Sequence, residues 1–369
     1  MERNSTSRVR NVAVGLLRWG LFLLVLWYVA SQARALWDAN RDIDVEVDWK
    51  YLVAAGLVSQ LSWLPSTWFW QRLIELLGEQ NLERYPLIRA YFCGSLGKYI
   101  PGKAAVILIR SALVKKHGVS FVRASIASMV EAGAVMLVGC VVTVVFAVTI
   151  IPPDALPEWF LRTFPRESTS WSSLLLAVVV LVLVMPVVAV PANWIFAKIA
   201  RIVEQRSRQK AINADTESVQ ESPDESIESR IGKLTWQFLV VASLMFALSW
   251  AGHGLSLLLV LRSMNQEAFS LDAWAISTSA AAAGTSIGFF AVFAPGGLAV
   301  REGLIITMLQ PSTGGAVAVA AAALYRLASL VAECVAALAL YVIPPRTTTS
   351  STRQAVRTST GKAGSETVD

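Results

Sequence analysis

Long stretches of apolar residues dominate this sequence and set the secondary structure that it predicts. Six runs are each close to or longer than the ~20 residues that an α-helix needs to cross the hydrocarbon of a bilayer. The expected fold class is therefore an all-α polytopic membrane protein with about six full spans. These spans are expected at Val12–Ala30, Tyr51–Trp70, Ala124–Ile151, Ser173–Val190, Leu234–Leu261 and Ala316–Ile343.

Two further apolar segments, Pro86–Leu113 and Ala273–Leu309, are interrupted by charge and by Pro-Gly turns that recur about half a chain apart. Such turns free backbone groups, and charge costs energy in lipid, so both segments must lie where protein or water can satisfy them. We expect two re-entrant hairpins. Their turns are predicted at Pro101, Gly102, Pro295, Gly296 and Gly297.

The two halves of the chain show the same order of elements. Each half reads as two spans, a broken Pro-Gly segment and a long span, and the second half begins at Ser173. Because each half contains an odd number of full crossings, the second copy must enter the membrane from the opposite side. This pattern predicts an inverted repeat, the arrangement by which secondary transporters build a binding site near the midplane.

Composition and charge support a membrane protein and give its orientation. Hydrophobic residues make up 55% of the chain, which is more than one soluble core of this length would hold. The net charge of +6 comes from Lys and Arg beside the spans, as in the N-terminal tail, Arg72–Arg123 and Lys198–Lys233, so we do not expect nucleic-acid binding. By the positive-inside rule both termini are cytoplasmic, and the protein is expected in the cytoplasmic (inner) membrane.

The expected domain organisation follows from these runs and from two polar stretches. The stretches at 203–233 and 344–369 are rich in Ser, Thr, Glu and Arg and poor in large apolar residues, which is typical of disorder. The chain then divides into a cytoplasmic tail (1–11), a first membrane repeat with the start of the second (12–202), a disordered cytoplasmic linker (203–233), the rest of the second repeat (234–343) and a disordered tail (344–369).

Charges inside the apolar runs are the candidates for function. Each costs about 2.5–3.5 kcal/mol at the centre of a span, so each needs a partner or a polar cavity. Glu131 and Arg326 follow the two Pro-Gly turns at nearly equal distances, which predicts that they pair near the midplane; a purely structural pair is the alternative. The expected cavity charges are Glu131, Glu302, Arg326 and Glu333.

Motifs of enzymes and of cofactor binding were not found. The chain has no phosphate-binding loop, no zinc-protease motif and no nucleophile elbow, so we expect no catalysis, no cofactor and no metal. Asp42 and Asp44 in the first external loop provide only a weak signal for a divalent cation, as in membrane glycosyltransferases.

The residues around the two turns resemble a known family. Gly97–Lys103 with Arg110, together with Pro295–Gly303, is similar to the lysylphosphatidylglycerol synthase transmembrane-region family, also called flippase-like integral membrane proteins. In that family the membrane region resembles a lipid flippase, and some members carry a cytoplasmic aminoacyl-transferase, which we expect this chain to lack. The sequence around Ala299 departs slightly from the family pattern. The resemblance implies that the site is formed by Pro101, Gly102, Arg110, Pro295, Gly296, Arg301 and Glu302.

The sequence therefore predicts a protein that moves an anionic or polyprenyl-linked lipid headgroup between leaflets, with membrane lipids as its partners. Basic side chains and freed helix N-termini suit a phosphate, and the expected headgroup-binding residues are Lys98, Lys103, Arg110 and Arg301. The alternatives are a membrane glycosyl- or aminoacyl-lipid transferase that uses Asp42 and Asp44, and an accessory scaffold whose partners are enzymes of cell-envelope synthesis.

Overall fold

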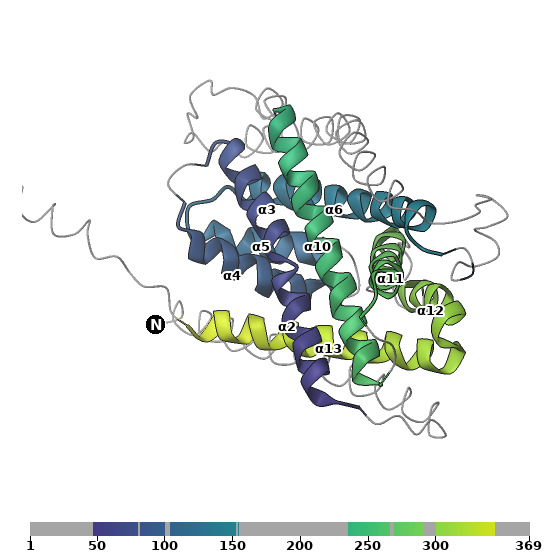
Figure 1. Cartoon of the computed structure of the whole chain (residues 1–369). Coiled ribbons are helices and arrows are strands. Elements are labelled where there is room, and N and C mark those ends of the chain that lie inside the picture. Colours follow the sequence, from purple (N-terminus) through teal and green to yellow (C-terminus); the bar gives the residue numbers. More distant parts are fainter. Residues whose placement is uncertain are drawn as a thin grey trace, which may run out of the picture.

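The computed structural model of the chain describes residues 47–79, 82–99, 104–152, 154, 235–265, 269–290 and 300–343. Within these residues the regular elements are all helices (Figure 1). They are α2 (Trp49–Leu61), α3 (Leu64–Leu76), α4 (Arg84–Ser95), the short 3-10 helix η1 (Leu96–Tyr99), α5 (Ala104–Lys115), α6 (Phe121–Thr149), α10 (Trp236–Ser263), α11 (Leu271–Phe290), α12 (Val300–Thr313) and α13 (Gly315–Val342). The expectation of an all-α membrane fold is confirmed for this part of the chain.

Three of these helices, α6, α10 and α13, are long and apolar enough to cross a membrane. They contain 28 or 29 residues, or roughly 42 Å of helix, which exceeds the ~30 Å of a hydrocarbon core. Large apolar side chains such as Leu248, Val335 and Leu338 are each 60% exposed, as expected for faces that contact lipid. The predicted spans at 124–151, 234–261 and 316–343 are thus confirmed as helices of spanning length.

The predicted span Tyr51–Trp70 is wrong as a single helix. The structure has two helices here, α2 and α3, separated by a turn at Ser62 and Trp63. Pro65 lies at the start of α3, where its missing N–H and fixed φ are tolerated, whereas inside a longer helix it would remove a backbone hydrogen bond and clash with the preceding turn. The Ser249 hydroxyl on α10 donates a 2.5 Å hydrogen bond to the carbonyl of Ser62, which satisfies one backbone group at the break.

Each of the two segments that carry a Pro-Gly turn is flanked by a pair of helices, and each pair forms a helical hairpin. In the first, α4 packs against α5, and in the second, α11 packs against α12. The helices α4 and α5 have 12 residues each, about 18 Å, which is too short to cross the bilayer, whereas α11 has 20 residues and about 30 Å. The turns themselves, at 100–103 and 291–299, lie outside the described residues.

Close contact between α11 and α12 depends on glycine. A Cβ atom on Gly284 would lie 2.8 Å from the carbonyl oxygen of Arg301, nearer than packed atoms approach. The run of four alanines before Gly284 is buried as well, with each residue at most 3% exposed. The small residues of α11 therefore bring the start of α12, with its charged pair Arg301 and Glu302, against the middle of the bundle.

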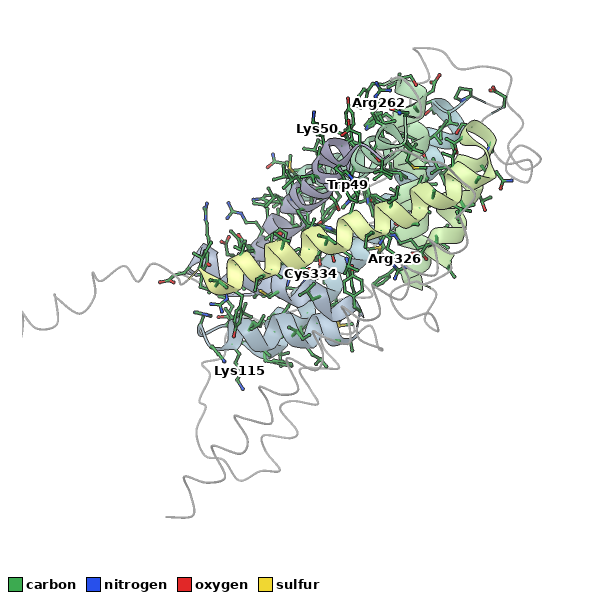
Figure 2. All side chains as sticks on the ribbon, turned by 90° about the horizontal axis from the view of Figure 1, so that it is seen from below. Trp49, Lys50, Lys115, Arg262, Arg326 and Cys334 are labelled. Carbon is green, nitrogen blue, oxygen red and sulfur yellow. The ribbon has the colours of Figure 1, made fainter. Side chains whose placement is uncertain are left out.

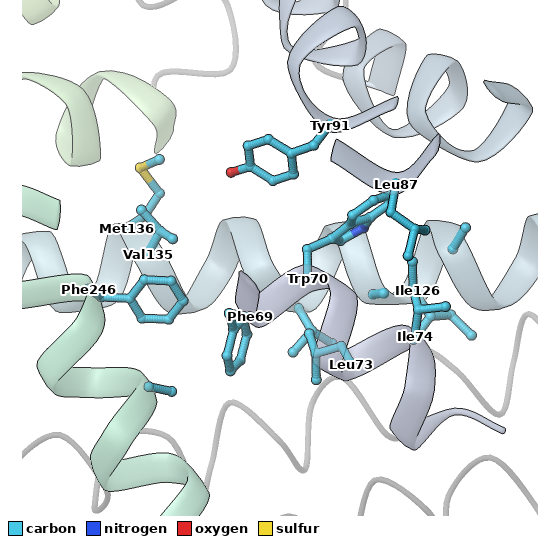
Figure 3. Close-up of a cluster of buried hydrophobic side chains, with 14 of the residues drawn as sticks. Phe69, Trp70, Leu73, Ile74, Leu87, Tyr91, Ile126, Val135, Met136 and Phe246 are labelled. Carbon is cyan, nitrogen blue, oxygen red and sulfur yellow. The ribbon is translucent and has the colours of Figure 1, made fainter. Parts of the chain in front are cut away.

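Two apolar cores flank the charged residues. The first joins α3, the first hairpin, α6 and α10 through large aromatic side chains, among them Trp70, Tyr91 and Phe246 (Figure 3). The second joins α10, α11, α12 and α13 with residues of α2 and the end of α6, and it consists mainly of alanine and aliphatic side chains. In Figure 1 the first hairpin lies to the left of α10 and the second to its right, and α10 itself packs on α2, α3 and α6 and on α11 of the second hairpin.

The predicted spans Val12–Ala30 and Ser173–Val190, the linker 203–233 and the tail 344–369 lie outside the described residues. The count of six spans, the division into domains and the location of the termini stay predictions. The order of contacts in the described part is repeated, because α5 packs on α6 as α12 packs on α13, and α6 packs on α11 as α13 packs on α4.

Candidate functional site

The first hairpin contains a buried ion pair with the span that follows it. Arg110 on α5 places its Nη1 2.9 Å from Oε2 of Glu131 on α6. Their side chains are 7% and 4% exposed. This contact follows from the packing of α5 between α4 and α6, which turns the polar face of the short helix toward the long one. Both charges are thereby neutralised inside the bundle.

Residues of α4 complete this pair. The Tyr91 hydroxyl donates a 2.8 Å hydrogen bond to Oε1 of Glu131, and Nη2 of Arg110 donates a 3.1 Å bond to the Ser95 hydroxyl. The Arg110 guanidinium carbon also lies 3.7 Å from the centroid of the Tyr91 ring, which is a cation–π contact. Arg110 is thus engaged by a carboxylate, a hydroxyl and an aromatic face. The structure therefore places Arg110 in the contacts that hold α4, α5 and α6 together.

The second hairpin contains an equivalent ion pair with the signs exchanged. Glu302 on α12 pairs with Arg326 on α13, the span that follows it. The two side chains are 20% and 14% exposed, so this pair is more open to its surroundings than the first. In both hairpins the second helix and the next span are thus joined by one acid and one base. Figure 2 shows the position of Arg326 along α13.

The predicted pair between Glu131 and Arg326 is wrong. Glu131 binds Arg110, and Arg326 binds Glu302. The equal distances from the two turns do indicate equivalent positions, but equivalent positions on α6 and α13 both face their own hairpin. Each charge therefore finds its partner on the neighbouring short helix of the same half, where the chain brings the two helices into contact.

A third ion pair joins the two halves of the chain. Lys98, on η1 of the first hairpin, places its Nζ 2.5 Å from Oε1 of Glu333 on α13. The Tyr99 hydroxyl donates a 2.9 Å hydrogen bond to Oε2 of the same carboxylate. The Lys98 ammonium also lies 5.9 Å from the centroid of the Trp63 ring, at the break between α2 and α3. Glu333 is thus held from one side by two consecutive residues of the Gly97–Lys103 motif.

Arg301 has no carboxylate within ion-pair distance in the part of the chain that the structure describes. Its guanidinium carbon lies 5.4 Å from the centroid of the Tyr325 ring. Both Arg301 and Arg326 are close enough to Lys98 to interact with it electrostatically. We call Lys98, Arg301, Glu302, Arg326 and Glu333 the central cluster.

The central cluster contains three cations and two carboxylates, and its excess charge is positive. Five of the eight charged residues that the sequence singled out are therefore brought together, and Arg110 and Glu131 form the separate pair of the first hairpin. Lys103 and the turn residues Pro101, Gly102, Pro295, Gly296 and Gly297 lie outside the described residues. This arrangement suits the binding of an anion rather than of a cation.

The sequence did not predict the aromatic residues of the site. Tyr91, Tyr99, Tyr325 and Trp63 each contact one of the charges, as described above. Tyr99 could have been found because it stands inside the first motif, next to Lys98. The others carry no local signal, since an aromatic residue in an apolar span is expected to pack in the core.

No group of three or more His, Cys, Asp and Glu side chains that could hold a metal ion occurs among the described residues. Asp42 and Asp44, on which the transferase alternative depends, lie outside them.

The chain was compared with known protein families. The profile of the lysylphosphatidylglycerol synthase TM region matches residues 12–336, which is most of the chain. The chain belongs to this family. Membership in the lysylphosphatidylglycerol synthase TM family confirms the resemblance that the two Pro-Gly motifs indicated, and it connects the helices of spanning length with membrane lipids. No curated protein and no solved structure matches the chain.

Proposed function

We propose that this protein moves the headgroup of an anionic or polyprenyl-linked lipid between the two leaflets of the cytoplasmic membrane. The observation that carries the proposal is the central cluster, in which Arg301 has no carboxylate partner among the described residues and cations outnumber carboxylates. A lipid phosphate supplies the missing negative charge. The acyl or polyprenyl tails stay in the surrounding lipid while the headgroup crosses the polar centre.

The cost of charge in a membrane supports an anionic ligand. A cation at the centre of a span costs about 2.5–3.5 kcal/mol, and ion pairing removes most of that cost. Arg110 and Arg326 have carboxylate partners. Arg301 has the Tyr325 ring as its neighbour, and a cation–π contact offsets about 0.5–2 kcal/mol. A phosphate bound to Arg301 would offset the rest of the cost of this charge. The planar guanidinium of Arg301 fits two phosphate oxygens.

Lys98 is the second residue assigned to the headgroup. It is held by Glu333 in the structure, and a phosphate would compete with that carboxylate for the ammonium. Since Lys98 and Glu333 come from different halves of the chain, release of this ion pair on phosphate binding would loosen one half from the other. Arg110, already engaged by Glu131 and Ser95, is assigned a supporting role rather than the headgroup contact first expected for it.

The repeated order of contacts supports an inverted repeat as the frame for this movement. Each half contributes a hairpin, a following span and one intervening acid–base pair, with the signs exchanged. Two such halves that rock against each other would open the cluster to one leaflet and then to the other. Transport would be passive or coupled to an ion, with Glu131, Glu302 and Glu333 as candidate proton carriers.

Leaflet exchange in reconstituted vesicles tests this function. The full chain is inserted into liposomes with acyl-labelled anionic phospholipid, and the protected fraction of label is followed with a membrane-impermeant quencher. Arg301→Gln is expected to stop exchange while the protein still inserts, because it removes the cation that has no carboxylate partner. Arg72→Gln is the matched control, since Arg72 is 51% exposed and pairs with Glu75 on its own helix.

The same assay separates transport from the transferase alternative. Replacement of Asp42 and Asp44 together by Asn is expected to leave exchange unchanged, since we interpret them as ordinary loop acids. If the paired Asp change abolishes activity on lipid while Arg301→Gln does not, the flippase proposal is wrong and a metal-dependent transferase takes its place.

A further inference from the structure

The C-terminal end of α13 is held by the first helix of the first hairpin. The Tyr85 hydroxyl on α4 lies 2.6 Å from the carbonyl oxygen of Ile343 and 3.0 Å from that of Leu340, so it can donate to either. The Arg89 guanidinium carbon, one turn further along α4, lies 4.9 Å from the centroid of the Tyr341 ring. Because carbonyl groups at the end of a helix lack partners within it, these contacts fix the end of α13 beside the start of α4.

The end of α5 lies at the same end of the bundle. A Cβ atom on Gly94 would lie 3.3 Å from the Cα of Arg110, and a Cβ atom on Gly97 would lie 3.0 Å from the Cα of Val106, so the two arms of the hairpin run antiparallel. Continued along both arms, this register brings the start of α4 to the level of Lys115, the last residue of α5. Figure 2 shows Lys115 at the end of the molecule where α13 ends.

Basic residues outnumber acidic residues around this end of the first hairpin. Glu75 pairs with Arg72 near the end of α3, and Glu79 pairs with Arg123 at the start of α6. Among the described residues of this end, the remaining acid is Glu83, directly before α4. Four basic side chains here have no carboxylate within ion-pair distance in the part of the chain that the structure describes. We call these four residues the basic rim: Arg84, Arg89, Lys115 and Lys116.

The opposite end of the bundle lacks this positive excess among its described residues. The 29 residues of α6, about 43 Å of helix, separate the two ends. The last turn of α6 packs with the start of α2 and the end of α10, where the Asp48 N–H donates to the Ser263 carbonyl. The charged residues described at that end are three acids and two bases, namely Asp48, Lys50, Asp154, Arg262 and Asp272. The positive excess thus belongs to the end that the positive-inside rule predicts to be cytoplasmic.

The neighbours of the basic rim put it at the depth of lipid headgroups. On the last turns of α13, Leu338 is 60% exposed and Val342 is 67% exposed, as expected for side chains that contact acyl tails. Tyr85 and Tyr341 lie beside the rim, and tyrosine is enriched at the membrane–water interface. A partner at this surface therefore meets apolar and cationic groups together. The acyl tails and phosphates of one leaflet match both, whereas an acidic soluble protein matches only the charges.

We propose that the basic rim binds anionic phospholipids of the leaflet that it faces, as resident lipids that the protein does not transport. Their phosphates bridge the cations of α4 and α5 beside the end of α13 and so hold the first hairpin against that helix. Each basic residue near an anionic membrane surface raises the affinity for that surface roughly fivefold, so the four residues act together. The site is distinct from the central cluster, because α4, about 18 Å long, lies between Arg84 and Lys98.

Thermal unfolding in lipid nanodiscs tests this inference. The full chain is placed in discs of phosphatidylcholine alone and in discs that also contain phosphatidylglycerol, and the anionic discs are expected to raise the melting temperature. The double variant Lys115→Gln with Lys116→Gln is expected to lose about half of this rise, since it removes two of the four rim charges. Lys115→Arg with Lys116→Arg is expected to keep the rise. Lys50→Gln is the matched control and is also expected to keep it, because Lys50 is exposed but lies at the opposite end of the bundle.

Salt separates the exposed rim from the central cluster. The rise is expected to shrink as the screening length falls from about 30 Å at about 0.01 M salt to about 3 Å at about 1 M. Arg301→Gln is expected to keep this salt-sensitive rise whether or not the protein moves lipid, so the result does not depend on the proposed function.

Three results would overturn the inference. The first is equal melting temperatures of the wild-type chain in both kinds of disc. The second is a full rise in the folded Lys115→Gln, Lys116→Gln variant or, if that variant folds poorly, a rise in wild type that salt does not change. The third is an equal rise when inorganic phosphate is added to phosphatidylcholine discs, which would assign the basic rim to a free anion.

Discussion

Removal of one charge from the Arg110–Glu131 pair is expected to destabilise the protein strongly. In Glu131→Gln the side chain keeps its size, but the negative charge is lost and Arg110 remains charged in the interior. The Tyr91 hydroxyl keeps an acceptor oxygen in the glutamine amide, so the main change is electrostatic. The first hairpin packs against α6 through this contact, and its helices α4 and α5 are too short to be held by lipid alone.

The magnitude follows from burial. The two side chains are 7% and 4% exposed, and breaking a buried ion pair from one side costs about 3–5 kcal/mol. Replacing both partners with apolar residues of similar size leaves no uncompensated charge. The double variant Arg110→Met with Glu131→Met is therefore expected to be much closer to wild type than Glu131→Gln, within about 2 kcal/mol.

Equilibrium unfolding in mixed detergent micelles measures these differences, with the secondary structure followed by circular dichroism. Glu75→Gln is the matched control. Its partner Arg72 lies 2.7 Å away, but the two side chains are 43% and 51% exposed, so this change is expected to cost at most about 1 kcal/mol.

Two results would refute this reasoning. If Glu131→Gln costs no more than Glu75→Gln, the pair does not hold the hairpin. If Glu131→Gln and Arg110→Met both fold like wild type but stop leaflet exchange, Arg110 acts on the headgroup, as the sequence first indicated, and the supporting role assigned here is wrong.

Two further predictions concern helix contact and topology. Gly284→Val is expected to destabilise the chain by about 1–3 kcal/mol, because its Cβ would meet the Arg301 carbonyl oxygen at 2.8 Å. Gly303→Ala, with no atom within 4 Å of the added Cβ, is the control and is expected to be neutral or stabilising by up to about 1 kcal/mol. Thermal unfolding in detergent compares the two variants, and equal losses of stability would contradict the close contact. Reporter fusions after Lys233 and after Arg346 are expected on the same, cytoplasmic side, and opposite sides would contradict the inverted repeat.

The exchanged signs of the two hairpin pairs explain one error of the sequence interpretation. The sequence places Glu131 and Arg326 at equivalent positions, which agrees with their place on α6 and α13. It also predicts that this acid and this base are partners of each other. The structure pairs each with the short helix of its own hairpin, because those helices pack directly on the span while α6 and α13 contact the opposite hairpins.

The sequence by itself determined the helices of spanning length, the two broken segments and the family. The thickness of the bilayer sets how many apolar residues a span needs, and a run of that length is visible in the local sequence. Hydropathy therefore located α6, α10 and α13. The run at 51–70 predicts one span although it forms two helices, because hydropathy is insensitive to a helix break. Pro65 was visible in the sequence, but a proline inside an apolar run is compatible with either a kink or a break.

Only the tertiary structure decided which charges meet. Lys98 and Glu333 are separated by most of the chain, and so are Trp63, at the α2–α3 break, and His253, on α10. Their contacts depend on how each helix is rotated about its axis and on which neighbours it packs against. Those choices are made by the fit of small residues such as Gly284 and of the aromatic core, a property of the whole bundle that no local pattern of apolar and polar residues encodes.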